Sequence, residues 1–342
     1  MFNINNRRYI GNKTKLMPWI KELIENNCKN CNSFCDIFAG TGSVTNEMIN
    51  NYQTFYINDF LYSNEIIYKG FFLNQTYNVN KLNIIKKEYN NININMDNYV
   101  SLNYGNKYFH KITARKIGFI REDLENKYKN KEINEKEYSI LSTSLLYSID
   151  RIANTVGHYE AFIQKEIKED NFVFELITPI DIKLLNNKSI YIYREDANEI
   201  IKNINADIIF IDPPYNSRQY SRFYHVLETI IKWDKPQLNG VAMKPKEENM
   251  SNYCRSTALK SFEDLIQKIN GKYIVVTYNN TYNSKSKSSK NKIKLEEIKQ
   301  CLEQKGKTLI FEQDYNAFNA GKTNLNEHKE YVFICEIQKK EE

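Results

Sequence analysis

An acid, two prolines and an aromatic residue follow one of the most apolar stretches of the chain. Residues 208–211 are four consecutive apolar residues, and Asp212, Pro213, Pro214 and Tyr215 come directly after them. A buried strand of this kind carries the residues after it to the edge of the sheet where open α/β folds bind ligands. Each proline fixes φ and removes a backbone donor, so carbonyl oxygens remain as acceptors. The motif offers a ligand a carboxylate, carbonyl oxygens and an aromatic ring.

These groups suit an amino group attached to a flat base. Asp212 and the carbonyl of Pro213 can accept its two N–H groups, which turns the nitrogen lone pair toward an electrophile. As a methyl group arrives, nitrogen becomes positive, and a fixed carboxylate stabilises that charge more in the transition state than before it. Tyr215 can stack on the base, a contact of about 1–3 kcal/mol. We therefore predict Asp212, Pro213 and Tyr215 as catalytic residues of methyl transfer to a base amine.

A second group of residues has the features of a nucleotide-binding turn. Residues 36–42 read Asp-Ile-Phe-Ala-Gly-Thr-Gly and follow a short apolar run. Glycines let the backbone approach a ligand closely, and an acid at the end of the next strand can hold ribose hydroxyls. Asp59 is placed for that role. Val44 stands where a dinucleotide motif would have its third glycine, so no pyrophosphate need be held. An ordinary tight turn is the alternative for this motif taken alone.

Apolar, β-branched runs recur along the chain and must position both motifs. They alternate with helical segments, which predicts an α/β fold with a doubly wound, mainly parallel sheet. A first helix is expected with Thr14 as its N-cap, and a second from Ser43. Strands are expected at residues 34–38, 55–57, 189–193, 207–211, 272–276, 308–311 and 330–334.

The intervening residues 60–187 are mostly polar and helix-like, with a charged helix expected around 126–137. The simplest organisation is a catalytic domain made of residues 1–59 and 188–342, interrupted by a helical insertion at 60–187. The lysine- and serine-rich tract at 283–290 is expected to be a mobile basic loop.

Composition limits the class of protein without defining it. The 342 residues are 41% hydrophobic, which is enough for a sizeable core, and the net charge of +6 suits a polyanionic partner. The N-terminus lacks the apolar segment of a secretory signal, and no run approaches the ~18–20 apolar residues of a membrane span. We expect a soluble, cytoplasmic protein. Cys28, Cys31 and Cys35 have no fourth Cys or His nearby, so we expect free thiols and no metal site.

The motifs together resemble the D12 class of N6-adenine DNA methyltransferases, the Dam-like or α-type enzymes. Residues 8–13, Arg-Tyr-Ile-Gly-Asn-Lys, are similar to the opening motif of that family, and the order of the motifs agrees. The family often has tryptophan at the position of Tyr9 and Gly-Gly at that of Gly11-Asn12. Residues 108–109, 153–159 and 216–220 look like a subgroup from type II restriction–modification systems. The resemblance implies S-adenosylmethionine as cofactor, duplex DNA as partner, a short palindromic target such as CATG, and a separate cognate endonuclease.

The resemblance also implies roles for individual residues. Lys13 would offer its ammonium to the methionine carboxylate, and Asp36 would face the methionine ammonium. Asp59 would hold the ribose, and Asp196 would lie beside the cofactor's adenine. The full set expected around the cofactor is Tyr9, Lys13, Asp36, Phe38, Gly40, Gly42, Asp59 and Asp196.

The resemblance gives the insertion at 60–187 a function in DNA recognition. A duplex hides the amine of a paired base, so the enzyme needs further contacts to the DNA to reach it. The enzyme must rotate the nucleotide out at a cost of a few kcal/mol and read neighbouring base edges in the major groove. DNA contacts are expected from Arg115, Arg121, Arg218, Arg222 and Asn279. For each arginine the alternative is a solvated surface side chain. The amine needs no strong base, so we interpret His158 and His225 as structural or DNA-facing.

Three other functions are compatible with parts of this pattern. N4-cytosine methylation could use the same acceptor pocket, but the aspartate that opens the 212–215 motif and the motif order favour adenine. An RNA adenine methyltransferase would not need so large an insertion. A catalytically inactive nucleic-acid-binding relative would not need both motifs to be chemically complete.

Overall fold

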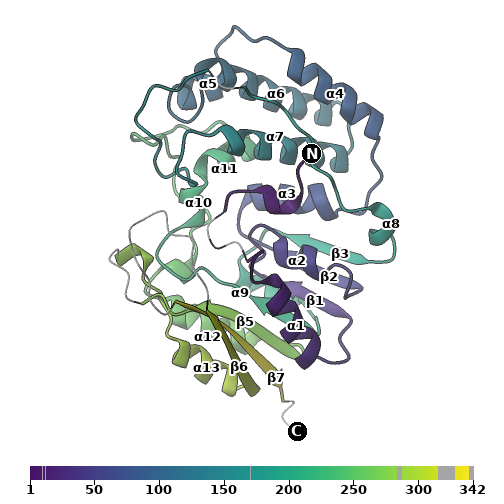
Figure 1. Cartoon of the computed structure of the whole chain (residues 1–342), viewed down its shortest axis with the longest axis vertical. Helices are drawn as coiled ribbons and strands as arrows, with labels where there is room; N and C mark the ends of the chain where they lie inside the picture. Colours follow the sequence, from purple (N-terminus) through teal and green to yellow (C-terminus); the bar gives the residue numbers. More distant parts are fainter. Residues whose placement is uncertain (10, 12, 170, 283–286, 315–327, 339–342) are drawn as a thin grey trace. The chain divides into compact units, whose positions relative to one another are not determined.

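The computed structural model describes residues 1–9, 11, 13–169, 171–282, 287–314 and 328–338. The chain forms two compact units, and each is assembled from separate segments (Figure 1). The sheet unit contains Lys13–Phe60, Lys188–Gln219 and Asn249–Glu342. The helical unit contains Met1–Asn12, Leu61–Asn187 and Tyr220–Glu248. Nearly all of the predicted insertion lies in the helical unit, which also takes in residues 1–12 and 220–248.

The sheet unit is built on a seven-stranded sheet with the order β3-β2-β1-β4-β5-β7-β6. All four pairings among β1 to β5 are parallel, whereas β7 is antiparallel to both β5 and β6. The fold is therefore α/β with a mixed, mostly parallel sheet, as the sequence predicted. The strands are β1 (Ser33–Asp36), β2 (Thr54–Asn58), β3 (Ser189–Tyr193), β4 (Ile208–Ile211), β5 (Tyr273–Asn279), β6 (Gly306–Asp314) and β7 (Lys329–Ile337).

Helices pack on the sheet through the apolar residues of its strands. The helices of this unit are α1 (Met17–Asn27), α2 (Ser43–Met48), α9 (Ala197–Ile200), α12 (Ala258–Lys268) and α13 (Leu295–Glu303). One core joins the apolar sides of α9, α12 and α13 to alternate residues of the central strands, such as Ile209 and Ile211. The start predicted for α2 at Ser43 is confirmed. The N-cap predicted at Thr14 is wrong: α1 begins at Met17, because Pro18 has no N–H and must lie in the first turn.

The order of the strands reverses between β1 and β4. From β1 the chain adds β2 and β3 on one side, and it then adds β4 and β5 on the other side. The carboxyl ends of β1 and β4 consequently lie next to each other at one edge of the sheet. In open α/β sheets this reversal is where ligands bind.

The helical unit contains eight α-helices in its described residues. They are α3 (Tyr62–Phe72), α4 (Val79–Asn91), α5 (Tyr99–Tyr104), α6 (Lys111–Lys129), α7 (Glu135–Ile152), α10 (Tyr220–Phe223) and α11 (His225–Lys232), with the short α8 (Ile182–Leu185). Among the residues that the structure describes, no helix has both the length and the apolar character needed to cross a membrane.

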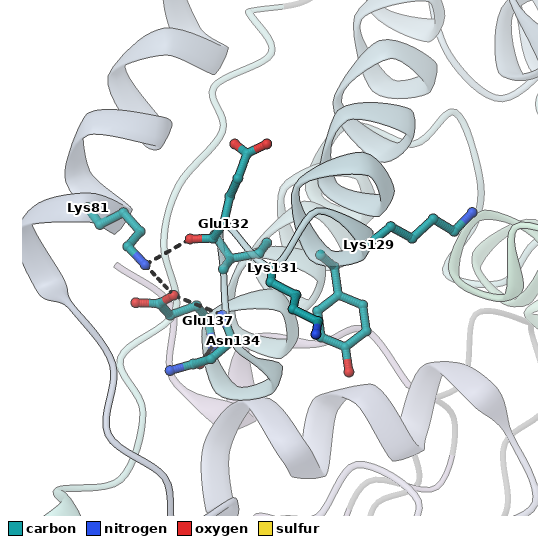
Figure 2. A pocket seen from close by; sticks show the side chains of 8 residues that line it. Lys81, Lys129, Lys131, Glu132, Asn134 and Glu137 are labelled. Carbon is teal, nitrogen blue, oxygen red and sulfur yellow. Dashed lines mark hydrogen bonds and ion pairs between the residues drawn. The ribbon is translucent and has the colours of Figure 1, made fainter.

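The charged helix predicted around 126–137 is wrong, because two helices meet there. Asn134 caps α7 by accepting the N–H of Glu137, whose carboxylate accepts the N–H of Asn134 in return. A pocket of about 460 Å³ lies at this junction (Figure 2). Figure 2 shows Lys81 bonded to the carboxylate of Glu137 and to the carbonyl of Glu132, at 2.8 and 3.0 Å. These contacts join α4 to the start of α7 and to the loop between α6 and α7.

Candidate active site

The two sequence motifs meet where the strand order reverses. Asp36 is the last residue of β1, and Asp212 follows the last residue of β4. The register places Asp36 beside Phe210, and the N–H of Ile37 donates to the carbonyl of Phe210 at 3.2 Å. Both carboxyl groups are therefore held at the same edge of the sheet by neighbouring parallel strands.

The glycine turn after β1 has the backbone conformation that glycine permits. Gly40 and Gly42 have φ values of +53° and +77°, in the left-handed region that side chains disfavour. Gly42 precedes the first residue of α2, and its N–H donates to the carbonyl of Ala39 at 2.7 Å. Asp59, at the end of β2, accepts the N–H of Gly40 at 3.0 Å. The acid expected to hold a ribose is thus tied to the glycine turn.

Asp36 is a buried carboxyl group with one unused oxygen. It is 1% exposed, and its Oδ2 accepts a hydrogen bond from the hydroxyl of Thr45 at 2.9 Å. Among the described residues, its buried Oδ1 has no hydrogen-bond partner. Burial raises the pKa of Asp36 from 3.8 to about 7; the bond from Thr45 opposes this rise, and the charges of Asp212 and Asp59 add to it. A cation that reached Oδ1 would favour the ionised form.

An aromatic pair lies beside the predicted position of the cofactor's adenine. The ring of Phe38 contacts the ring of Tyr253 edge to face, with centroids 4.9 Å apart. The hydroxyl of Tyr253 donates to Asn198 at 2.9 Å, and the N–H of Asn198 donates to Asp196 at 2.8 Å. Asp196 thereby caps α9. The contacts bring two of the predicted cofactor residues, Phe38 and Asp196, into one local group.

Five polar residues form what we call the acid cluster: Lys13, Asp212, Tyr215, Thr277 and Glu330. The ammonium of Lys13 lies 2.7 Å from Glu330, 2.7 Å from the hydroxyl of Tyr215 and 3.2 Å from Oδ1 of Asp212. Oδ1 of Asp212 also accepts the hydroxyls of Tyr215 and Thr277, at 2.6 and 2.7 Å. The hydroxyl of Tyr215 lies 2.9 Å from Glu330. These contacts of Asp212 with described residues all reach Oδ1, which leaves Oδ2 for a substrate.

The electrostatics of the acid cluster keep Lys13 charged and Tyr215 neutral. Burial by itself lowers the pKa of Lys13, but the carboxylates of Asp212 and Glu330 outweigh it, and the pKa is raised. Burial, together with the same two carboxylates, raises the pKa of Tyr215 well above 10. The ring of Tyr215 lies under the ammonium of Lys13 and beside Tyr278, with centroids 4.3 Å apart.

Two residues of the opening motif have surroundings different from those expected. The three N–H groups of the Lys13 ammonium are directed to the acid cluster, so this placement does not support the expected contact with a methionine carboxylate. Tyr9 belongs to the helical unit, where its ring stacks on Tyr224 and Tyr220 with centroids 4.8 and 5.2 Å apart. Ile10 and Asn12 lie outside the described residues.

The residues expected to contact DNA are divided between the units. In the sheet unit, Arg218 donates to the hydroxyl of Ser289 at 2.7 Å, and Asn279, at the end of β5, accepts the side-chain amide of Asn291 at 2.9 Å. In the helical unit, Arg222 donates to the carbonyl of Pro245 at 2.8 Å. The basic loop expected at 283–290 falls partly outside the described residues.

Arg115 and Arg121 differ in exposure although both lie on α6. Arg115 forms an ion pair with Asp97 at 2.8 Å, and 26% of its side chain is exposed. Arg121 is 1% exposed and donates to the carbonyls of Ile230 and Ile231, at 2.8 and 2.9 Å. A buried guanidinium engaged in this way cannot reach a phosphate, so the prediction of Arg121 as a DNA contact is wrong.

His225 is buried, and its two ring nitrogens lie 3.0 and 2.7 Å from the carbonyls of Arg222 and Ala242. Burial lowers its pKa to about 4, although both carbonyls act in the opposite direction. The residue is structural. Across the described ranges, no three His, Cys, Asp or Glu residues gather as metal ligands.

Sequence reasoning missed three residues of the site: Thr277, Glu330 and Tyr253. Thr277 and Glu330 belong to strands, and Tyr253 to a 3-10 turn (Asn252–Cys254). The one available signal was Glu330, an acid at the start of the apolar strand expected at 330–334. Buried acids are nearly always paired, so such a residue points to a buried cation.

Comparison with known proteins agrees with this geometry. The family model of the D12 class N6 adenine-specific DNA methyltransferases matches residues 9–283. The type II methyltransferase M.FokI of Planomicrobium okeanokoites is 33% identical, over 96% of this chain and 52% of that protein. Modification methylase LlaI of Lactococcus lactis subsp. lactis is also 33% identical, over 80% of this chain and 46% of that protein. The type II methyltransferase M.NlaIII of Neisseria lactamica is 30% identical, over 96% of this chain and 98% of that protein. The chain thus spans about half the length of the first two relatives and almost all of the third.

Proposed function

Because the chain belongs to the D12 class of N6 adenine-specific DNA methyltransferases, we propose that it transfers a methyl group from S-adenosylmethionine to adenine N6 in a short duplex DNA sequence. The observation that carries the proposal is the position of Asp212. It directly follows β4, the neighbour of β1 and its glycine turn, and its Oδ1 is fixed by Tyr215 and Thr277. Its Oδ2 and the carbonyl of Pro213 accept the two N–H groups of the target amine.

The glycine turn and Asp36 fit the cofactor. S-Adenosylmethionine supplies an electrophilic methyl group when it is bound. Gly40 and Gly42 have no side chains, so a ligand can approach the backbone of the turn closely. Phe38 contacts Tyr253, which is linked through Asn198 to Asp196. The unpartnered Oδ1 of Asp36 suits the methionine ammonium, and Asp59 suits the ribose.

Asp212 acts on the amine through its fixed charge. As nitrogen forms its bond to the methyl carbon, the bond of that carbon to sulfur breaks and nitrogen becomes positive. A preorganised carboxylate stabilises that charge without reorganising. The amine then loses one proton, which can leave through Asp212. Tyr215 presents its ring to the base, and its hydroxyl holds the carboxylate in place.

The helical unit recognises the target in this proposal. Arg115 and Arg222 on that unit, and Arg218 and Asn279 on the sheet unit, are the proposed contacts to DNA. The base must be turned out of the duplex before Asp212 can hold its amine. By analogy with its type II relatives, the enzyme protects DNA from a separate endonuclease, with a short palindrome such as CATG as target.

The test is methyl transfer by the full chain to duplex DNA, followed by mapping of the modified positions. We expect labelled methyl groups on adenine N6 within one short sequence. In Asp212→Ala the single-turnover rate should fall by a factor on the order of 10²–10³ or more, with cofactor binding retained. Methyl groups on cytosine N4 would reassign the substrate. DNA binding without any transfer would indicate an inactive relative, and a near-normal rate in Asp212→Ala would remove the proposed role of Asp212.

A further inference from the structure

Glu330 is a charged residue in the interior of the sheet unit. It lies in β7 and is 1% exposed, and the following residues Val332, Phe333 and Ile334 are buried and apolar. Its carboxylate lies 2.7 Å from the ammonium of Lys13 and 2.9 Å from the hydroxyl of Tyr215. Isolated carboxylates are very costly to bury, so this arrangement depends on its partners.

Glu330 changes the charge of the acid cluster. With it, the cluster has two carboxylates and one ammonium, which leaves one negative charge. Without it, the ammonium of Lys13, 3.2 Å from Asp212, would face the carboxylate of Asp212 alone and cancel its charge. Lys13 is closer to Glu330 than to Asp212, at 2.7 Å against 3.2 Å.

We propose that Glu330 is a positioning residue that binds the ammonium of Lys13 and so leaves Asp212 with an uncompensated negative charge for the target amine. The inference rests on the proposed function, because it concerns the charge that develops on the amine during methyl transfer. A neutralised Asp212 could still accept a hydrogen bond, but it would stabilise that charge much less. Lys13 then serves to order Asp212 and Tyr215 without cancelling the charge of the site.

Other ionisable groups face this cluster from neighbouring strands. Asp36 on β1 and Asp212 interact through their charges, and His328, just before β7, lies near Glu330 and Lys13. The ring of His328 lies 3.2 Å from the hydroxyl of Thr281, and burial lowers its pKa. Among the described residues, Lys13 is the cation that forms ion pairs with both Asp212 and Glu330.

The first experiment removes the charge of Glu330 and keeps its size. In Glu330→Gln we expect single-turnover methyl transfer to slow by about tenfold or more, with cofactor affinity changing less than the rate. Glu336→Gln is the matched control, because it removes an exposed acid from the same strand. A rate in Glu330→Gln equal to that of the control would overturn the proposal. If the unmodified enzyme and the control methylate adenine, the proposed function stands whatever Glu330→Gln does.

The second experiment separates charge from structure. Lys13→Met/Glu330→Gln restores one negative charge to the cluster while it removes further contacts. We expect this double variant to transfer methyl groups faster than Glu330→Gln alone. A merely structural role predicts the opposite order, because two altered buried residues disturb the site more than one. A double variant as slow as or slower than Glu330→Gln would overturn the proposal.

The third experiment needs no turnover and does not require Glu330→Gln to fold. In cofactor-free Lys13→Met, Asp212 and Glu330 face each other across Tyr215 without a cation, so mutual repulsion should raise the pKa of one of them. Carboxyl groups labelled with ¹³C and followed by NMR should show one group titrating about one pH unit or more higher than in the unmodified protein. An unchanged set of titration curves would mean that Glu330 and Asp212 are not coupled, and the proposal would fail.

Discussion

At the scale of single residues, Asp36 illustrates how a buried carboxyl group can be prepared for a cation. Burial raises its pKa from 3.8 to about 7, so the folded protein keeps a proton that the unfolded chain has already lost. The free energy of unfolding therefore decreases as pH rises from about 4 to about 7, and this contribution is constant above that range. A bound ammonium would favour the ionised carboxyl group, lower its pKa and so weaken this pH dependence.

Asp36→Asn removes this titration and should remove its pH dependence. In cofactor-free protein, the stability of the unmodified chain relative to Asp36→Asn should decrease by a few kcal/mol between about pH 4 and pH 7, because each pKa unit corresponds to about 1.4 kcal/mol. Thermal unfolding of both proteins across that range measures the difference. A difference that stays constant with pH would contradict the buried, protonated state of Asp36.

At the scale of elements, Arg121 connects two helices of the helical unit. The last carbonyls of an α-helix have no partner within the helix. At the end of α11, the carbonyls of Ile230 and Ile231 accept hydrogen bonds from Arg121 on α6. Arg121 also forms an ion pair with Glu125 at 3.0 Å. Its side chain thus caps a helix, which accounts for its burial.

Arg121→Met should lower the free energy of unfolding by about 3 kcal/mol, because it leaves buried carbonyls and a carboxylate without their donor. Arg115→Met is the matched control on the same helix. Its ion pair with Asp97 is partly exposed, so its loss should cost about 1 kcal/mol or less. Urea denaturation measures both. Equal, small losses would show that Arg121 does not cap α11.

At the scale of the whole molecule, the net charge of +6 bears on how DNA binds. Each cation that neutralises a phosphate releases counterions, so affinity decreases with salt in proportion to the number of such contacts. Arg218, three residues beyond the catalytic motif, is the proposed phosphate contact of the sheet unit.

Arg218→Ala should weaken binding to target and non-target duplexes by similar factors and reduce the slope of log affinity against log salt by about one. Titrations of labelled duplexes at several salt concentrations give the slope. Lys260→Ala, at an exposed position on α12, serves as the control and should leave the slope unchanged. An unchanged slope in Arg218→Ala would remove Arg218 from the phosphate contacts.

The sequence alone determined the features that depend on neighbouring residues. We could predict the seven strand positions from their runs of apolar residues. We could predict the glycine turn and the Asp-Pro-Pro-Tyr motif from the backbone preferences of glycine and proline and from side-chain chemistry. All of these are local properties of the chain. Asp36 and Asp212 could be expected at one sheet edge because parallel strands place their carboxyl ends together.

The tertiary structure alone decided which distant side chains meet. Lys13 and Glu330 are 317 positions apart and form an ion pair because β7 inserts beside β5 in the antiparallel direction. Arg121 has a side chain of the kind that contacts DNA phosphates, yet it is buried because α11 ends beside α6. Burial and charge pairing depend on how all the elements pack, and no local pattern in the chain specifies that packing.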